Sequence, residues 1–429
     1  MAIVAVVIFV AAYILIVTER VHRVAAALAG AAAMALLGIV DAQTAFFSEE
    51  TGIDWNVIFL LLGMMIIVGV IRQTGLFEFL AIWAAKRSRG RPFRVMVMLI
   101  LITAVASALL DNVTTVLLIA PVTFLVCERM NVPPVPFLIA EALAANIGGT
   151  ATLIGDPPNI IIASRAGLSF NDFLVNLAPL VVVLLIVFIG LCRWLFRDAF
   201  QYDPDRVDEV MELDEREAIS DRKLLVRCLL VLAGVTIGFV LHSALHIDPS
   251  VVALLGAGAI ILVSRTRPSQ FLEEVEWPTL VFFMGLFIMV GGLVETGVIE
   301  RLGESAEEAV GGRPLLAVTV LLFGSAVLSA IVDNIPYVTT MAPLVERLVE
   351  GVPDPTQGEA LWWALALGAD LGGNATAVGA SANVVIIGLA AKYGHPISFW
   401  TFTRYGLVVA AITVALSWPY LALRYFVLG

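Results

Sequence analysis

Polar residues of a kind that can bind ions interrupt two long apolar stretches of this sequence. The segment GGTATLIGDPPN at 148–159 holds an aspartate, an asparagine and two threonines among helix-breaking glycines and prolines. The segment GGNATAVGASAN at 372–383 repeats its glycines and its final asparagine at an offset of 224 residues. Carboxylates, hydroxyls, amides and unwound carbonyls are hard oxygen ligands, which suit sodium or a proton better than a transition metal. The chemistry expected here is therefore the binding of a small cation.

A second pair of polar segments lies inside apolar runs that are too long for one membrane span. These segments are SALLDN at 107–112, within the run 93–130, and SAIVDN at 329–334, within the run 314–349. Each run is predicted to be a re-entrant helical hairpin whose tip carries the Asp-Asn pair. The two tips should approach the membrane midplane from opposite sides and share a site with the broken segments, because unpaired backbone survives there only next to protein or a polar cavity.

The aspartates at the hairpin tips have two interpretations. Asp111 and Asp333 stand where the second helix of each hairpin begins, so they can act simply as N-caps. A carboxylate near the membrane midplane carries an extra cost of about 2.5–3.5 kcal/mol, which a Ser or Asn cap would avoid. This cost favours a role in binding.

Three acidic residues have no acidic residue at the equivalent position of the other half. Asp156 aligns with Ala380, Asp370 aligns with Asn146, and Glu141 aligns with Leu365. Asp156, Asp370 and Glu141 are the candidate proton carriers, since a buried carboxyl group takes up a proton or a cation more readily than a solvated one. The candidate substrate-binding and ion-binding residues, which would also hold sodium, are Ser107, Asp111, Asn112, Thr114, Thr115, Asn146, Gly149, Thr150, Thr152, Gly155, Asp156, Asn159, Ser329, Asp333, Asn334, Asp370, Gly373, Asn374, Thr376, Ser381 and Asn383.

The composition explains what must position these residues. Of 429 residues, 60% are hydrophobic and 14% are charged, which is typical of a protein that crosses a lipid bilayer many times. Full spans are predicted near 2–18, 24–41, 55–72, 173–194, 224–244, 250–264, 277–294 and 402–425. Two further spans, near 135–165 and 361–391, are interrupted by the polar segments.

The chain also contains an internal repeat. Residues 55–78 match 277–300 at an offset of 222 residues, and the hairpin segments match at the same offset. Each half has five spans, an odd number, so the two halves should run through the membrane in opposite senses. The predicted fold is all-α and polytopic, with two inverted-topology repeats at 1–197 and 224–429 that are joined by a charged linker at 198–223.

Basic residues orient the chain. The stretch KRSRGRPFR at 86–94 marks the cytoplasmic side, which leaves Arg165, Arg301, Arg313, Arg347 and Arg424 as the basic residues outside. The linker is then cytoplasmic and both termini face out, as expected of a protein in the cell membrane. The net charge of −11 comes mainly from loops such as 203–217, which are expected to be solvated.

Several function classes find no support in the sequence. The three cysteines and four histidines are scattered and show no metal-binding spacing. The sequence contains no GxxxxGK motif and no Gly-x-Gly-Asp motif, so neither nucleotide hydrolysis nor intramembrane proteolysis is expected. We therefore expect no enzyme activity, no cofactor beyond a coupling ion and no nucleic-acid partner, and nothing supports a separate ATPase subunit on the linker.

Four motifs in order resemble a known group of transporters. They are LLDNVTTVLLIAPVT, NIGGTATLIGDPPNIII, VDNIPYVTTMAPL and LGGNATAVGASANVV. The chain resembles the arsenite permease, NhaD-type sodium/proton antiporter and P protein branch of the ion transporter superfamily over essentially its whole length. The resemblance implies a scaffold domain, a transport domain built from the hairpins and broken helices, an elevator movement and a homodimer. Related dicarboxylate carriers have Ser-Asn-Thr at the hairpin tips, which is absent here and argues against citrate or succinate.

The expected function is secondary active transport of a small inorganic ion. The resemblance implies arsenite or antimonite efflux driven by a proton gradient or the membrane potential. Two alternatives stay open on sequence alone: a sodium/proton antiporter and, in a different class, an anion channel.

Overall fold

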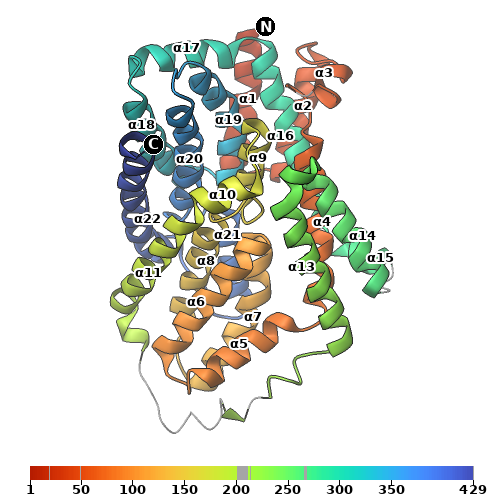
Figure 1. Ribbon diagram of the computed structural model, residues 1–429, viewed down its shortest axis with the longest axis vertical. Helices are drawn as coiled ribbons and strands as arrows, with labels where there is room; N and C mark the ends of the chain where they lie inside the picture. The colour runs from red at the N-terminus through yellow and green to blue at the C-terminus, as the bar shows by residue number, and fades with distance from the viewer. Residues whose placement is uncertain (19, 49, 201–210, 213, 265–267, 429) are drawn as a thin grey trace.

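The computed structural model describes residues 1–428 except 19, 49, 201–210, 213 and 265–267. All regular structure in the described residues is helical, which confirms the predicted all-α class (Figure 1). Residues 203–210 and 213 of the loop at 203–217, which was predicted to be solvated, lie outside the described residues, and so does the same part of the linker at 198–223.

The first half of the chain contains eleven α-helices within the described residues. They are α1 Ala2–Val17, α2 Arg23–Leu36, α3 Ala42–Phe46, α4 Trp55–Arg72, α5 Leu76–Arg87, α6 Pro92–Leu109, α7 Asn112–Met130, α8 Val135–Gly149, α9 Pro157–Ala166, α10 Phe170–Asn176 and α11 Ala178–Leu195, followed by a short 3₁₀ turn at Arg197–Ala199.

The second half repeats this order. Its helices are α13 Arg222–Leu245, α14 Pro249–Ser264, α15 Pro268–Glu273, α16 Trp277–Glu295, α17 Val298–Val310, α18 Pro314–Ile331, α19 Asn334–Glu350, α20 Pro355–Gly373, α21 Ser381–Lys392 and α22 Phe399–Ala422, with a π-helical turn at Leu423–Val427. Within the described residues of the second half, no separate helix corresponds to α10.

Span lengths differ from the prediction in three places. The described residues contain eight helices that are long and apolar enough to cross a membrane, and α6, α7 and α18 of the two hairpins are among them. The span predicted at 24–41 ends at Leu36, because Gly38 adopts a positive φ of 68° that terminates the helix. The span predicted at 173–194 is broken at Leu177, where α11 begins with a proline in its first turn.

Helices of the first half pack against helices of the second half. Helix α4 packs against α14, and α16 packs against α2 in the equivalent way. A Cβ added at Gly63 of α4 would lie 2.8 Å from the Ala253 Cβ, and one added at Gly285 of α16 would lie 3.0 Å from the Ala27 Cβ. Glycine at these two repeat-related positions lets the helices of opposite halves come into backbone contact.

The two hairpins enter the molecule from opposite ends. In Figure 1 the pair α6 and α7 lies in the lower part, whereas α18 and α19 lie in the upper part. Each pair reverses at its Asp, at Leu110–Asp111 and at Val332–Asp333. The broken helices run beside them, with gaps between α8 and α9 and between α20 and α21.

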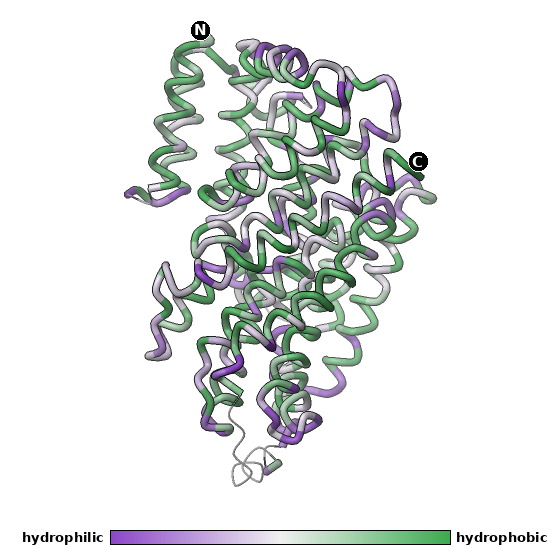
Figure 2. Tube along the Cα trace, turned by 90° about the vertical axis from the view of Figure 1, so that its left-hand side faces the viewer, coloured by the Kyte–Doolittle hydropathy of each residue, from purple (hydrophilic) through white to green (hydrophobic). Residues whose placement is uncertain are grey.

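The surface of the helical body is apolar. Figure 2 shows hydrophobic residues along most of the helices, with hydrophilic stretches mainly where helices end. Large side chains such as Ile3, Leu230 and Leu262 are exposed. An exposed apolar surface of this extent needs a lipid environment, so the chain is a multi-pass membrane protein.

Candidate functional site

Two pairs of glycines let each broken segment fold back on itself. A Cβ at Gly149 would lie 2.5 Å from the Gly155 carbonyl oxygen, and a Cβ at Gly155 would lie 2.4 Å from the Gly149 carbonyl oxygen. The second half repeats the crossing, with 2.8 Å at Gly373 and 2.6 Å at Gly379. No side chain fits between these backbones, so the glycines predicted at the site serve its architecture.

Four hydroxyl groups attach the hairpins to the broken helices. Ser107 donates to the Ala145 carbonyl at 2.7 Å, and Thr152 donates to the Ala108 carbonyl at 2.5 Å. Ser329 donates to the Ala369 carbonyl at 2.6 Å, and Thr376 donates to the Ala330 carbonyl at 2.5 Å. These predicted binding residues thus use their protons to hold each tip in place.

A chain of amides connects the two halves in a single direction. Asn383 donates its Nδ2 to the Gly373 and Thr376 carbonyls, both at 2.9 Å, so its Oδ1 must accept. Asn146 donates to that Oδ1 at 3.1 Å and to the Asn374 Oδ1 at 2.9 Å, so its own Oδ1 must also accept. Asn112 donates to the Asn146 Oδ1 at 3.0 Å. Backbone carbonyls therefore fix the orientation of each of these amides.

The chain of amide side chains ends at Asp156, and both hairpin tips contact this residue. Asn112 of the first tip donates its Nδ2 to Oδ2 of Asp156 at 2.8 Å. Asn334 of the second tip donates to both carboxylate oxygens at 3.3 Å. Asp156 is 1% exposed. All three contacts arrive from amide donors, so the carboxyl group acts as an acceptor, as an ionised carboxylate does.

Asp370 is the other core carboxylate whose repeat counterpart is not acidic, and it has no such partners. Its side chain is fully buried, and neither carboxyl oxygen has a hydrogen-bond partner among the described residues. Thr150 donates instead to the Asn146 carbonyl at 2.8 Å. The Thr115 hydroxyl is likewise buried without a partner in the described part of the chain.

Asp111 and Asp333 cap the second helix of each hairpin. Asp111 accepts from the Thr114 N–H at 2.7 Å, and Asp333 accepts from the Ile335 N–H at 3.1 Å. Asp333 also accepts from the Ser381 hydroxyl at 2.6 Å. Both aspartates line a cavity of about 430 Å³ beside the tips, so capping and lining of a cavity occur together.

The cavity has a second wall, which the sequence motifs did not predict. It lies between the hairpin tips and helices α1, α2, α4 and α16, and Arg23, Glu276 and Thr279 line it. The Arg23 guanidinium donates to Ser381 Oγ at 3.3 Å and to Thr279 Oγ1 at 3.4 Å, and it lies 5.4 Å from the centre of the Phe282 ring. The repeat contained a signal for this residue, because α2 begins with Arg23 where α14 begins with Pro249.

Glu141 lies away from this constellation. It is buried between α7 and α8, where Thr123 donates to it, and it does not line the cavity. Eight residues separate it from Gly149, which corresponds to about 12 Å along α8. The structure therefore brings Asp156 and Asp370 into the core and leaves Glu141 outside it.

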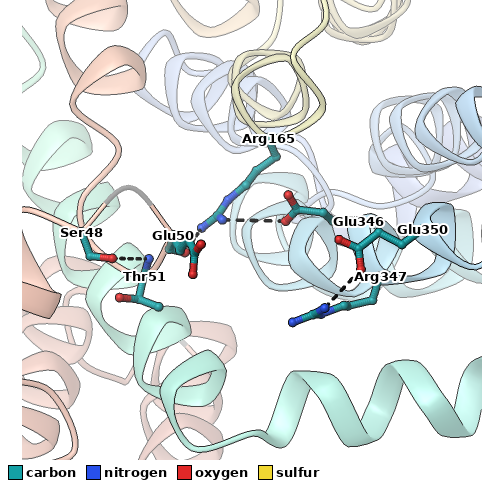
Figure 3. Close-up of polar contacts among 7 residues, drawn as sticks. All are labelled: Ser48, Glu50, Thr51, Arg165, Glu346, Arg347 and Glu350. Atoms are coloured by element: carbon teal, nitrogen blue, oxygen red, sulfur yellow. Dashed lines mark hydrogen bonds and ion pairs between the residues drawn. The ribbon is translucent and has the colours of Figure 1, made fainter.

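A polar cluster ties the end of α9 to two other segments. The Arg165 guanidinium donates to the Glu50 carbonyl at 2.9 Å and lies 3.9 Å from the Glu346 carboxylate of α19 (Figure 3). The neighbouring Arg347 pairs with Glu350 at 3.1 Å. Arg165 thereby holds the broken helix of the first half against the hairpin of the second.

A known protein family matches most of this chain. The family described as "Citrate transporter" matches residues 13–368. The chain belongs to the citrate transporter family. The predicted membership of the ion transporter superfamily is thereby confirmed.

Relatives of this citrate transporter family member cover its whole length. It is 58% identical over 428 residues to an uncharacterized transporter of Mycobacterium bovis and 56% identical over 429 residues to a 46 kDa membrane protein of Mycobacterium leprae, covering 100% of each chain. It is 34% identical over 503 residues to the mouse P protein, covering 99% of this chain and 60% of that one. Its relatives indicate a membrane transporter.

A solved structure shows the same fold. The YdaH transporter of Alcanivorax borkumensis, described as having an unusual topology, matches with a TM-score of 0.61 at 15% identity, covering 85% of this chain and 84% of that chain. At this identity the match supports the fold alone.

Proposed function

We propose that this protein is a secondary active transporter that couples movement of its substrate to a cation held at Asp156. The observation that carries the proposal is the meeting of both hairpin tips at one buried carboxylate, through Asn112 and Asn334. An acid that holds both tips links its charge state to their position. A channel would have no need for such a link.

The amide chain suggests how the coupling works. Asp156 receives only donors, because the backbone carbonyls at Gly373 and Thr376 fix the amide orientations as far as Asn112. A proton on Asp156 would set its O–H against the N–H groups of Asn112 and Asn334, and a bound cation would compete for the same oxygens. Loading of Asp156 should therefore loosen the contact between the tips.

We propose that the moving unit is built from the hairpins and broken helices, and that α1, α2, α4 and their repeat counterparts form the scaffold. The cavity lies at the boundary between these groups, where an elevator movement would carry it across the membrane. We place the protein in the cell membrane as a homodimer, with the first hairpin and the linker facing the cytoplasm.

For the substrate, we propose arsenite or antimonite efflux driven by a proton gradient or the membrane potential. Neutral arsenite presents three hydroxyl groups, which the hydroxyl and carboxylate groups of the cavity can bind by hydrogen bonds. None of Cys127, Cys192 and Cys228 lines the cavity, so recognition would not use thiols. A carboxylate anion such as citrate is the second candidate, because the family carries that name and Arg23 places a cation in the cavity.

A substrate panel in proteoliposomes and everted vesicles tests the proposal. Sodium, protons, arsenite, chloride and citrate are offered to the wild type, to Asp156→Asn and to Asp41→Asn, an exposed helix cap that serves as the matched control. We expect arsenite accumulation under a proton gradient, a loss of about 100-fold in Asp156→Asn and activity within about twofold of wild type in Asp41→Asn.

The other outcomes of the panel discriminate among the alternatives. Sodium/proton exchange without arsenite movement would establish an antiporter, and citrate uptake would establish the second candidate. Currents far above carrier turnover in a bilayer recording would establish a channel. Full coupled transport of any substrate by Asp156→Asn would contradict the role of Asp156.

A further inference from the structure

Two buried acceptor groups lie together in the core without a donor between them. They are the Asp370 carboxyl and the Oδ1 atom of the neighbouring Asn159. Among the described residues, none of these oxygens accepts a hydrogen bond of normal distance and angle. Asn159 cannot turn its amide, because its Nδ2 donates to the Gly149 carbonyl at 3.4 Å and the Thr152 carbonyl at 3.0 Å. The Thr150 hydroxyl, which also neighbours Asp370, has already donated to the Asn146 carbonyl.

The other half of the molecule shows what completes this arrangement. Asn383 is the repeat counterpart of Asn159, and its Nδ2 is held in the same way by the Gly373 and Thr376 carbonyls. Its Oδ1 accepts from Asn146 at 3.1 Å. Asp370 is the counterpart of Asn146, so a carboxyl group stands where the other half has an amide donor.

The energetic consequence is large because both groups are buried. Each buried acceptor without a partner costs about 1–3 kcal/mol, and an unpaired charge costs more. One cation removes both penalties. A proton on Asp370 lets the carboxyl donate to Asn159, and a sodium ion between them meets only oxygen ligands.

We propose that Asp370 and Asn159 hold a monovalent cation, a proton or a sodium ion, separately from the ion at Asp156. The cation site stands on the buried unpartnered atoms alone. Its role as a second coupling ion rests on the proposed function.

The repeat also supplies the substitution that tests the site. In Asp370→Asn, the new amide can donate to the Asn159 Oδ1 as Asn146 donates to Asn383, so the protein should fold as though the site were permanently filled. In Asp370→Leu, the Asn159 Oδ1 stays unpaired, so this variant should be destabilised under all ionic conditions. Within the described residues, Asp156 is the titratable group that interacts with Asp370. It must therefore be replaced by a residue that does not titrate.

The measurement is thermal unfolding of the full-length protein in detergent micelles, with Asp156→Asn as the parent. The parent and the Asp156→Asn/Asp370→Asn double variant are compared in sodium chloride and in choline chloride, near pH 6 and near pH 9. We expect the parent to gain about 2–4 °C from sodium or from the lower pH, and the double variant to lose that gain. A response to sodium at constant pH identifies the metal ion, and a response to pH in choline identifies the proton.

Equal shifts in the parent and the double variant would overturn the cation site, because Asp370 would then contribute nothing to the response. This outcome is independent of the transport panel. Failure of every transport assay with the stability difference intact would remove the proposed function and leave the site standing.

Discussion

The two halves of the molecule share an architecture and differ in chemistry. Both halves have a hairpin with an Asp-Asn tip, a glycine crossing in the broken helix and an asparagine tied to two backbone carbonyls. In the alignment of the two repeats, however, Asp156 corresponds to Ala380, and Asp370 corresponds to Asn146. The repeated architecture therefore determines where the polar groups meet. The residues that differ between the two halves determine what can bind there.

The same asymmetry reaches the cavity wall. Arg23 begins α2, and Pro249 begins the equivalent helix α14. Among the described residues that line the cavity, Arg23 of the first half is the only arginine or lysine. The cavity is therefore asymmetric in charge even though the fold that carries it is built from two similar halves.

The largest predicted effect tests what the halves share. Gly155→Ala and Gly379→Ala place a Cβ within 2.4 Å and 2.6 Å of a carbonyl oxygen, so both should lower the yield of folded protein by about tenfold or more. Size-exclusion chromatography of detergent extracts measures this loss. Gly190→Ala and Gly388→Ala are the matched controls, because nothing lies within 4 Å of a Cβ at either position. Normal yields for Gly155→Ala would show that the crossing is not required.

The next effect compares the two amides that hold Asp156. Asn112→Ala removes a 2.8 Å bond to the carboxylate and leaves the Asn146 Oδ1 unpaired, whereas Asn334→Ala removes two longer contacts of 3.3 Å. We expect a loss of coupled transport of about 30-fold for Asn112→Ala and about 10-fold for Asn334→Ala. Initial rates in proteoliposomes measure both, with Asn171→Ala outside the core as the control. The reverse order would mean that the second tip holds the acid more strongly.

A smaller effect separates the two capping aspartates. Asp111→Ala should cost about 1 kcal/mol, the usual value of an N-cap. Asp333→Ala should cost about 1 kcal/mol more, because Ser381 loses its 2.6 Å acceptor and Arg23 loses a nearby negative charge. Thermal unfolding measures the difference, with the exposed cap Asp354→Ala as the reference. Equal costs at Asp111 and Asp333 would show that the contact with Ser381 and Arg23 adds no stability.

The smallest effect concerns a link between α5 of the first half and the linker. Lys86 of α5 donates to Glu215 of the linker at 2.6 Å, and this hydrogen bond lowers the pKa of Glu215 below its usual value near 4.5. Because the folded pKa is depressed, the stabilisation is present above about pH 4.5 and is lost as the pH falls through the folded value.

Glu215→Gln should therefore cost less than about 1 kcal/mol at neutral pH and nothing near pH 3, as thermal unfolding at the two pH values will show. The repeat counterpart of Lys86 is Glu308, so no equivalent pH-dependent link is expected in the second half. A cost that is the same at both pH values would refute the ionic origin of the contact.

Much of the fold could be predicted because it leaves local signals. The apolar run 93–130 with SALLDN near its middle predicted a hairpin, and the structure turns at Leu110–Asp111. The glycines at 148–149 and 155 predicted the break between α8 and α9 in the same way. These features depend on short stretches of sequence and on the repeat, so distant contacts were not needed to find them.

The rest of the site depends on contacts that no local pattern encodes. Ser107 and Thr152 were expected to bind ions, yet they donate to backbone carbonyls of segments 38 and 44 residues away. The direction of the amide chain follows from the Gly373 and Thr376 carbonyls, which become its starting point only in the folded protein. Arg23 joins the cavity because α2 packs against α16 of the opposite half.

The central claim is that Asp156 holds the coupling ion, and one comparison of two transport modes tests it most directly. In proteoliposomes, arsenite exchange at equal pH and sodium on both sides needs no net release of the coupling ion, whereas accumulation under a proton or sodium gradient does. Asp156→Asn is compared with Ala380→Asn, the equivalent position of the other half. The account predicts that Asp156→Asn retains exchange and loses gradient-driven accumulation, while Ala380→Asn retains both. Gradient-driven accumulation that persists in Asp156→Asn would contradict it.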